Sequence, residues 1–296
     1  MPSTRDIRRR IKSVKNTAQI TKAMQMVAAA KMRKAQQAAL VGRPYADLLN
    51  QILAEAGPRI VSFNHPLMEK RNVKKRGVIV VATDRGLCGA LNSNIARELI
   101  KLDKDSTIFI TAGKKAAQFI ARTKRQLAAD FLYKDTPTFA EARVISKFAQ
   151  DLFIKGEVDS VDILYSSFVS TLVQQPKLMP LLPIGKIEPL KVGINAPAEL
   201  AEQAAPGGVR TDVFEFEPDE ETVLSALLPH AMNFQVHQIL FEARASEQSA
   251  RMVAMKNATD NAKQLIKDLT LEYNKLRQSN ITKELLEIAT AQMAVG

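Results

Sequence analysis

The chain has 296 residues, and 42 Lys and Arg against 31 Asp and Glu give it a formal net charge of +11. Its single cysteine, Cys88, excludes an internal disulfide framework and indicates a reducing compartment. No apolar run approaches the roughly 20 residues of a membrane-spanning helix, and the first residues, MPSTRDIRRRIKS, lack the apolar core of a signal peptide. The length fits two ordinary domains, or one domain with an elongated part.

Residues 1–41 form a basic segment that contains ten Lys and Arg and one acid, Asp6. Ser3 or Thr4 is placed to cap a helix with Asp6 in its first turn. Neither Gly nor Pro follows until Gly42, so one long helix is predicted to end or bend there. Its heptad seam, which Thr21 and Gln25 weaken, consists of Ile7, Ile11, Val14, Ala18, Ala28, Met32, Ala35 and Ala39.

The middle of the chain alternates β-branched apolar runs with amphipathic helical segments. Such alternation predicts an α/β domain with a largely parallel, Rossmann-like sheet. The predicted strands are 77–84, 106–113 and 158–168, and the predicted helices are a segment capped by Asn92 or Ser93 that runs to Ile100, then 114–125 and 140–155. Prolines mark the exit from this domain, and residues 193–212 are rich in Pro and Gly, as is typical of a linker or surface loop.

The turns 84–89 and 111–115 follow predicted strands, where α/β folds often bind phosphate. Both lack the GxxxxGK[ST] and GxGxxG spacings that let backbone amides hold phosphate groups, so a tight strand-to-helix turn is favoured for each. Cys88 has no histidine near it in the sequence to act as a base, which favours a structural thiol. His230 and His237 are seven residues apart, a spacing that argues against a zinc site. We therefore predict no catalytic residue, no cofactor and no metal.

The last segment, Glu220 to Val295, is a predicted helix of unusual length. The 66 residues from His230 to Val295 contain no Gly or Pro, and such a helix would extend about 100 Å. Gln238, Gln248 and Thr259 interrupt its heptad seam, so the seam is predicted to be weak. The seam positions are Leu224, Leu227, Ala231, Phe234, Gln238, Phe241, Ala245, Gln248, Met252, Met255, Thr259, Ala262, Ile266, Leu269, Tyr273 and Leu276.

Two heptad helices at opposite ends of one chain pair only if the middle brings them together. The predicted fold is therefore an antiparallel coiled coil of the N- and C-terminal helices with the α/β domain inserted, and both termini lie on the coiled coil, remote from that domain. The predicted divisions are 1–57 for the N-terminal helix, 77–190 for the α/β domain, 191–217 for a linker and 218–296 for the C-terminal helix.

Three stretches carry a family resemblance. IRRRIKSVKNTAQITKAMQMVAAAKMRKAQ near the start, ATDRGLCGALN in the first turn and SEQSARMVAMKNATDNAKQLIKDLTLEYNKLRQSNITKELLEI near the end resemble the gamma subunit of F-type ATP synthase. The resemblance covers essentially the whole chain. It implies a non-catalytic rotor shaft inside a ring of alpha and beta subunits, with the α/β domain near the epsilon subunit and the membrane c-ring. It also implies a peripheral subunit on the cytoplasmic face of a bacterial plasma membrane.

The same resemblance implies which residues contact the ring. Arg251, Gln278, Thr282 and Glu284 match family positions that contact ring loops, and Met24 matches a position that packs against a beta subunit. Arg8 and Arg9 are further candidates on the same side. Arg251 has Glu247 four residues before it, and we expect an exposed pair worth only a few tenths of a kcal/mol. A solvated helix face remains the alternative reading of Arg251.

A basic coiled-coil protein that binds nucleic acid, or a scaffold, is the rival interpretation of residues 1–41. This segment has no aromatic residue for base stacking, and its basic residues spread around the helix. A small-molecule enzyme built on the α/β domain is disfavoured because no site is found.

Overall fold

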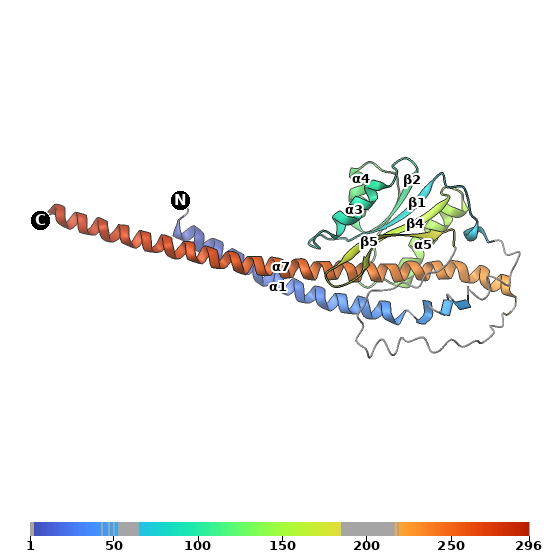
Figure 1. The fold of residues 1–296 in the computed structure, drawn as a ribbon, viewed down its shortest axis with the longest axis horizontal. Coiled ribbons are helices and arrows are strands. Elements are labelled where there is room, and N and C mark those ends of the chain that lie inside the picture. The colour runs from blue at the N-terminus through green and yellow to red at the C-terminus, as the bar shows by residue number, and fades with distance from the viewer. Residues whose placement is uncertain are drawn as a thin grey trace. The chain divides into compact units, whose positions relative to one another are not determined.

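The protein is a mixed α/β protein with long N- and C-terminal helices and a largely parallel sheet, as predicted, and the sheet has five strands (Figure 1). The computed structural model describes residues 3–42, 44–46, 48–49, 51–52, 65–184, 217 and 219–295. These residues form two compact units, one of Met1–Val27 with Met252–Gly296 and one of Ala28–Arg251. No helix in the described ranges is long and apolar enough to cross a membrane.

The two long helices have nearly the predicted bounds. α1 runs from Thr4 to Val41 and stops just before Gly42. Its N-terminus is capped by Ser3, whose hydroxyl accepts a bond from the Asp6 N–H at 3.2 Å. α7 runs from Glu220 to Val295 as one helix of 76 residues with Pro229 inside it. The predicted long uninterrupted helix is thus confirmed.

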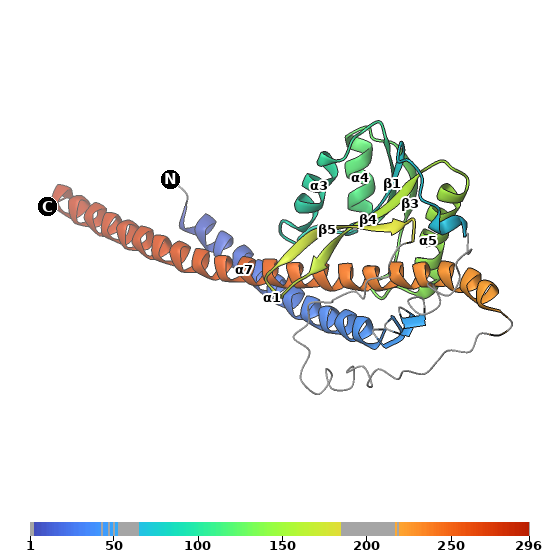
Figure 2. The same cartoon turned by 45° about the vertical axis from the view of Figure 1, so that its right-hand side comes forward.

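In the first unit, α1 and α7 lie side by side and run in opposite directions in both views (Figures 1 and 2). Their least exposed positions repeat with heptad spacing, because Ile7 and Thr21 on α1 and Met255, Thr259 and Ala262 on α7 are all buried. The Thr21 and Thr259 hydroxyls meet at 2.7 Å. In this unit the predicted seam positions are thus buried or half-buried.

This threonine pair offers a test of the weak seam. Thr21→Val or Thr259→Val alone is expected to cost about 1 kcal/mol, because each removes one hydrogen bond from a buried partner. The double replacement is expected to cost less than the sum or to stabilise the chain, because both polar groups then leave the seam together. Thermal unfolding of the four proteins measures the coupling, and strictly additive costs would contradict it.

The five-stranded sheet has the order β3-β2-β1-β4-β5. All neighbouring pairs are parallel except β4 with β5, which is antiparallel. The strands are β1 (Arg76–Val81), β2 (Thr107–Ala112), β3 (Leu127–Phe131), β4 (Ser160–Phe168) and β5 (Gln174–Leu182). The largely parallel sheet is confirmed, but β3 and β5 were not predicted. β5 contains Pro176 and Pro180, residues that an edge strand tolerates and that hide it from a pattern search.

Helices cover both faces of the sheet (Figure 2). The second unit also holds the short helix η1 (Pro66–Met68). One sheet face packs against α3 (Leu91–Lys101) and α4 (Lys114–Arg122), whereas the other packs against α5 (Phe139–Ile154) and one side of α7. The residues that α7 contributes to this core, called here the apolar seat, are Leu228, Met232, Val236, Ile239, Leu240 and Ala243.

Two details of the predicted helices were wrong. Neither Asn92 nor Ser93 caps α3; Ala90 holds the N-cap position, and the Asn92 amide turns back to donate to the Thr83 hydroxyl at 2.8 Å. α4 ends at Arg122 rather than at residue 125, because Lys124 takes a positive φ of 52° that breaks the helix. The predicted linker, residues 191–217, lies outside the described residues apart from Glu217.

Candidate functional site

The carboxyl ends of the parallel strands are the first place to look for a ligand site, since α/β folds bind ligands there. At this edge the Asp84 carboxylate accepts a bond from the Lys114 N–H at 3.2 Å, and the Thr83 carbonyl accepts one from the Lys115 N–H at 3.0 Å. The N-terminus of α4 is therefore satisfied by the turn after β1. This internal pairing leaves those amides no free role in phosphate binding.

The thiol and imidazole groups of the described residues are also engaged. Cys88 is buried against Leu91 and Ala250, and burial raises the pKa of its thiol, which favours the unreactive protonated form. The His230 ring bonds to the Tyr45 hydroxyl at 2.8 Å, and the His237 ring lies 3.1 Å from the Pro137 carbonyl oxygen. Among described residues, no group of three His, Cys, Asp or Glu side chains is suited to a metal ion.

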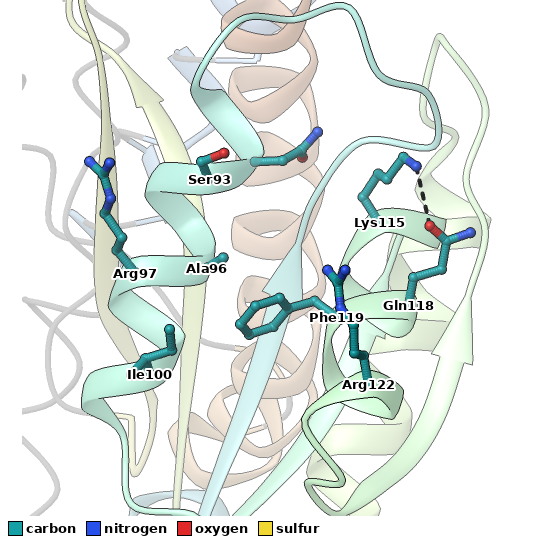
Figure 3. Close-up of a pocket in the computed structure, with 9 residues that line it drawn as sticks. Ser93, Ala96, Arg97, Ile100, Lys115, Gln118, Phe119 and Arg122 are labelled. Atoms are coloured by element: carbon teal, nitrogen blue, oxygen red, sulfur yellow. Dashed lines mark hydrogen bonds between the residues drawn. The ribbon is translucent and has the colours of Figure 1, made fainter.

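A shallow groove of about 580 Å³ lies between α3 and α4 (Figure 3). Arg97 comes from α3 and Lys115 and Arg122 from α4, with the Phe119 ring pointing toward α3 between them. Lys115 donates to the Gln118 side chain at 3.2 Å. Among the described residues that line this groove there is no carboxylate, thiol or imidazole, so they form no acid–base pair for catalysis. The charged side chains that line it are the three cations Arg97, Lys115 and Arg122.

We therefore expect the chain to bind MgATP no more tightly than about millimolar, the range left to a few solvated cations. Isothermal calorimetry on the purified chain measures this, and no ATP hydrolysis should accompany it. A Lys115→Ala, Arg122→Ala double variant is the matched control, because it removes the groove's α4 cations. Stoichiometric micromolar binding that this variant abolishes would contradict the prediction.

The predicted ring contacts near the end of α7 are free of the rest of the described chain. Gln278, Thr282 and Glu284 are all exposed, and the Thr282 hydroxyl bonds back to the Gln278 carbonyl at 3.0 Å. Helix geometry places Gln278 and Thr282 on one face and Glu284 on another. Large apolar side chains surround them and are exposed as well, namely Ile281, Leu285, Leu286, Ile288 and Met293.

On α1, Arg8 and Arg9 are exposed and Met24 is half-buried. Two of these three candidates therefore have side chains open to a partner. Within the described ranges, no hydrogen bond or ion pair joins these α1 residues to Gln278, Thr282 or Glu284 on α7. The structure therefore does not gather the candidates into one cluster.

Arg251 differs from the expectation. Its pair with Glu247, at 2.8 Å, is not exposed, because the two side chains keep only 11% and 5% of their accessible surface. The guanidinium also donates to the Arg85 and Gly86 carbonyls at 3.5 and 3.4 Å. The prediction of an exposed, nearly worthless pair was wrong: Arg251 holds the turn after β1, a tertiary contact that helix position alone does not reveal.

Sequence reasoning missed two buried charges on α7. Arg244, 3% exposed, bonds to Glu247 at 2.6 Å and to Asp84 at 3.2 Å, and its guanidinium stacks 4.0 Å from the centre of the Tyr133 ring. Glu242 accepts bonds from the Ser167 hydroxyl at 2.7 Å and the Phe168 N–H at 3.0 Å. Both charged residues stand in a segment otherwise rich in Ala and large apolar residues. This feature of the sequence could have indicated that they are buried and paired.

Together, the two long terminal helices and the five-stranded, largely parallel sheet place the chain in the class of mixed α/β proteins with long helices. A family model described as ATP synthase matches residues 3–295. The ATP synthase gamma chains of Opitutus terrae and Methylacidiphilum infernorum are 50% and 47% identical to this chain, over the full length of each. The chain belongs to the ATP synthase gamma family, and it is a non-catalytic subunit of that complex.

Solved structures agree on the fold. The Euglena gracilis mitochondrial ATP synthase rotor aligns with a TM-score of 0.63 at 20% identity, covering 94% of this chain and 98% of that one. A chain of the Euglena gracilis OSCP/F1/c-ring structure aligns with a TM-score of 0.68 at 22% identity, covering 99% of this chain and 94% of that one. The predicted family and fold are thus confirmed.

Proposed function

We propose that this chain is the central rotor shaft of a proton-translocating F-type ATP synthase, coupling proton flow through the membrane sector to conformational change at the catalytic sites of the alpha/beta ring. The observation that carries the proposal is α7, a single helix of 76 residues whose last described side chains, from Arg277 to Met293, are all exposed. Exposed Leu, Ile and Met side chains at this density mark a surface that a partner covers. A ring with an apolar inner surface is such a partner.

The pairing of α1 with α7 supports the same role. We propose that they form an antiparallel coiled coil, since their buried positions repeat every three and four residues. The seam contains Ala and Thr at several of these positions, and small residues give less adhesive surface than Leu. A helix pair is stiff along its axis, which suits a shaft that turns inside a bearing. The divisions 1–57, 77–190, 191–217 and 218–296 complete this proposal.

The proposed partners are the alpha and beta subunits, the epsilon subunit and the c-ring, with no nucleic acid. The solved relatives belong to a rotor and to an assembly of F1 with a c-ring, which supports these partners for this chain. The proposed location is the cytoplasmic face of a bacterial plasma membrane, as a peripheral subunit. Arg8, Arg9, Met24, Arg251, Gln278, Thr282 and Glu284 are the proposed contacts with the ring.

Co-expression with the alpha and beta subunits of the same source tests the function. The three chains are expected to co-purify as one complex that hydrolyses ATP, and a bead fixed to the α/β domain is expected to rotate when MgATP is added. A variant ending at Arg277 is the matched control; it removes the exposed end of α7 and should weaken the complex. Recovery of the chain with nucleic acid that salt releases, and without alpha and beta, would support the rival class instead.

A further inference from the structure

The last stretch of α7 in the second unit, residues 242–251, is held in a different way from the stretch before it. The apolar seat packs on the sheet through one side of the helix, because its residues recur at intervals of three and four. From Glu242 onward, buried charged and hydroxyl side chains add hydrogen bonds to the domain beside the apolar contacts of Ala245 and Ala250. Four side chains, called here the polar clamp, reach from α7 to strand β4 and to turns of the α/β domain: Glu242, Arg244, Ser249 and Arg251.

The polar clamp bonds to two separate parts of the α/β domain. Glu242 bonds to Ser167 and to the backbone of Phe168, and the Ser249 hydroxyl donates to the Thr171 carbonyl at 2.7 Å. These partners belong to β4 and the turn that follows it. Gln174, at the start of β5, also donates to Ser249 at 3.4 Å.

The other two clamp residues hold the ends of β1 and β3. Arg244 bonds to Asp84 and donates to the Tyr133 carbonyl at 2.7 Å, while Arg251 donates to the Arg85 and Gly86 carbonyls. Glu247 lies between the two arginines and pairs with both. All these partners lie at the carboxyl edge of the parallel strands, the edge where related α/β folds hold a ligand.

The two sets of clamp contacts lie on opposite sides of α7. At 3.6 residues per turn, Glu242 and Ser249 point nearly the same way, and Arg244 and Arg251 point about 180° from them. A one-sided contact lets a helix roll, whereas contacts on opposite sides resist rolling in both directions. Because the tips of side chains lie about 5–6 Å from the helix axis, a turn of about 10° shifts them by about 1 Å. A shift of that size breaks a hydrogen bond, while an apolar contact merely slides.

Stability alone does not account for these buried charges. A buried ion pair often adds less to stability than well-packed apolar residues of the same size would. Burial raises the pKa of the Glu242 carboxyl, and the bonds from Ser167 and Phe168 oppose that shift, so its charge is costly to keep there. Directional bonds fix an angle, which apolar packing does not.

We propose that the polar clamp is a torsional lock, which stops α7 from turning about its own axis against the α/β domain. Torque that enters through the α/β domain then passes to α7 without loss of angle. This inference rests on the proposed rotor function and assigns the residues that make its coupling stiff. Arg244 and Ser249 are positioning residues in this lock, since neither is a proposed ring contact.

The test measures the stiffness of the linkage in the assembled complex. The complex with alpha and beta is fixed to a surface, and a bead is attached through Lys104→Cys, an exposed turn residue of the α/β domain; the buried Cys88 stays unlabelled. Angular variance of the bead is recorded while rotation is paused. The Arg244→Met, Ser249→Ala variant removes more than half of the clamp's hydrogen bonds to the domain, so about a twofold rise in variance is expected. Arg244→Lys, which keeps the charge and loses the planar fork, should fall between it and the unchanged complex.

Val236→Ala is the matched control, since Val236 is fully buried in the apolar seat and makes no polar side-chain contact. It is expected to lower the Tm of the complex while leaving the angular variance at the value of the unchanged complex. Equal variance in the clamp variant and the unchanged, rotating complex would overturn the torsional lock. Failure of the unchanged complex to rotate at all would instead overturn the proposed function.

Discussion

Gly113→Ala is expected to destabilise the α/β domain strongly. Among the described glycines of the sheet and its turns, we expect replacement by alanine to cost most at this position. Gly113 links β2 to α4 with a φ of 111°, and a Cβ there would lie 2.2 Å from the Ala82 carbonyl oxygen. That oxygen belongs to the backbone at the end of β1, so it has no rotamer by which to escape. We expect a loss of roughly 3–5 kcal/mol, from the strained φ and from separation of the strands.

Thermal unfolding followed by circular dichroism measures this loss, and a Tm lower by about 10 °C is expected for a unit of this size. Gly156→Ala is the matched control. Gly156 has a φ of 73°, but nothing lies within 4 Å of its added Cβ, so only the backbone strain of roughly 1–2 kcal/mol applies. Similar Tm losses in the two variants would show that the close contact between the added Cβ at position 113 and the Ala82 carbonyl oxygen does not destabilise the domain.

The spacing of apolar residues was sufficient to predict the helices and strands that bury one face or all faces at regular intervals. The heptad positions of α1 and α7 and the β-branched runs of β1, β2 and β4 are examples, because their burial follows from periodicity. β3 was not predicted because its five residues, LAADF, include no β-branched residue and remain largely exposed at the sheet edge. β5 escaped because its prolines are typical of loops.

The site was harder to predict because its key contacts join residues that are far apart in sequence. Arg244 and Asp84 are separated by 160 positions, and no local pattern shows that they form an ion pair. Arg251 illustrates the same limit: its heptad position indicated a surface direction, yet the turn after β1 covers it. By contrast, the sequence itself shows that the turns at 84–89 and 111–115 lack phosphate motifs, because such motifs are defined by local residue types and spacing.

Arg251→Ala is expected to reduce ATP synthesis by the reassembled complex about tenfold or more, because a hydrogen bond to a charged group contributes roughly 1.5–3 kcal/mol. We propose that the 11% of the Arg251 side chain surface that stays exposed meets an acidic loop of a beta subunit in one rotary position and leaves it in the next. The Ala variant also lowers the Tm of the complex, since Glu247 loses one of its two arginine partners. Arg251→Lys should restore synthesis only in part, because lysine lacks the planar fork.

Glu247→Gln separates the ring contact from the contact within the chain. It removes the carboxylate that pairs with both Arg244 and Arg251, and it leaves Arg251 with its donors and with the Arg85 and Gly86 carbonyls. ATP synthesis in proteoliposomes and the Tm of each complex are measured together. If Arg251 contacts the ring, Arg251→Ala loses far more synthesis than Glu247→Gln, although Glu247→Gln disturbs both arginine pairs. If the two variants lose synthesis equally, Arg251 acts only by holding the turn after β1, and its role at the ring is rejected.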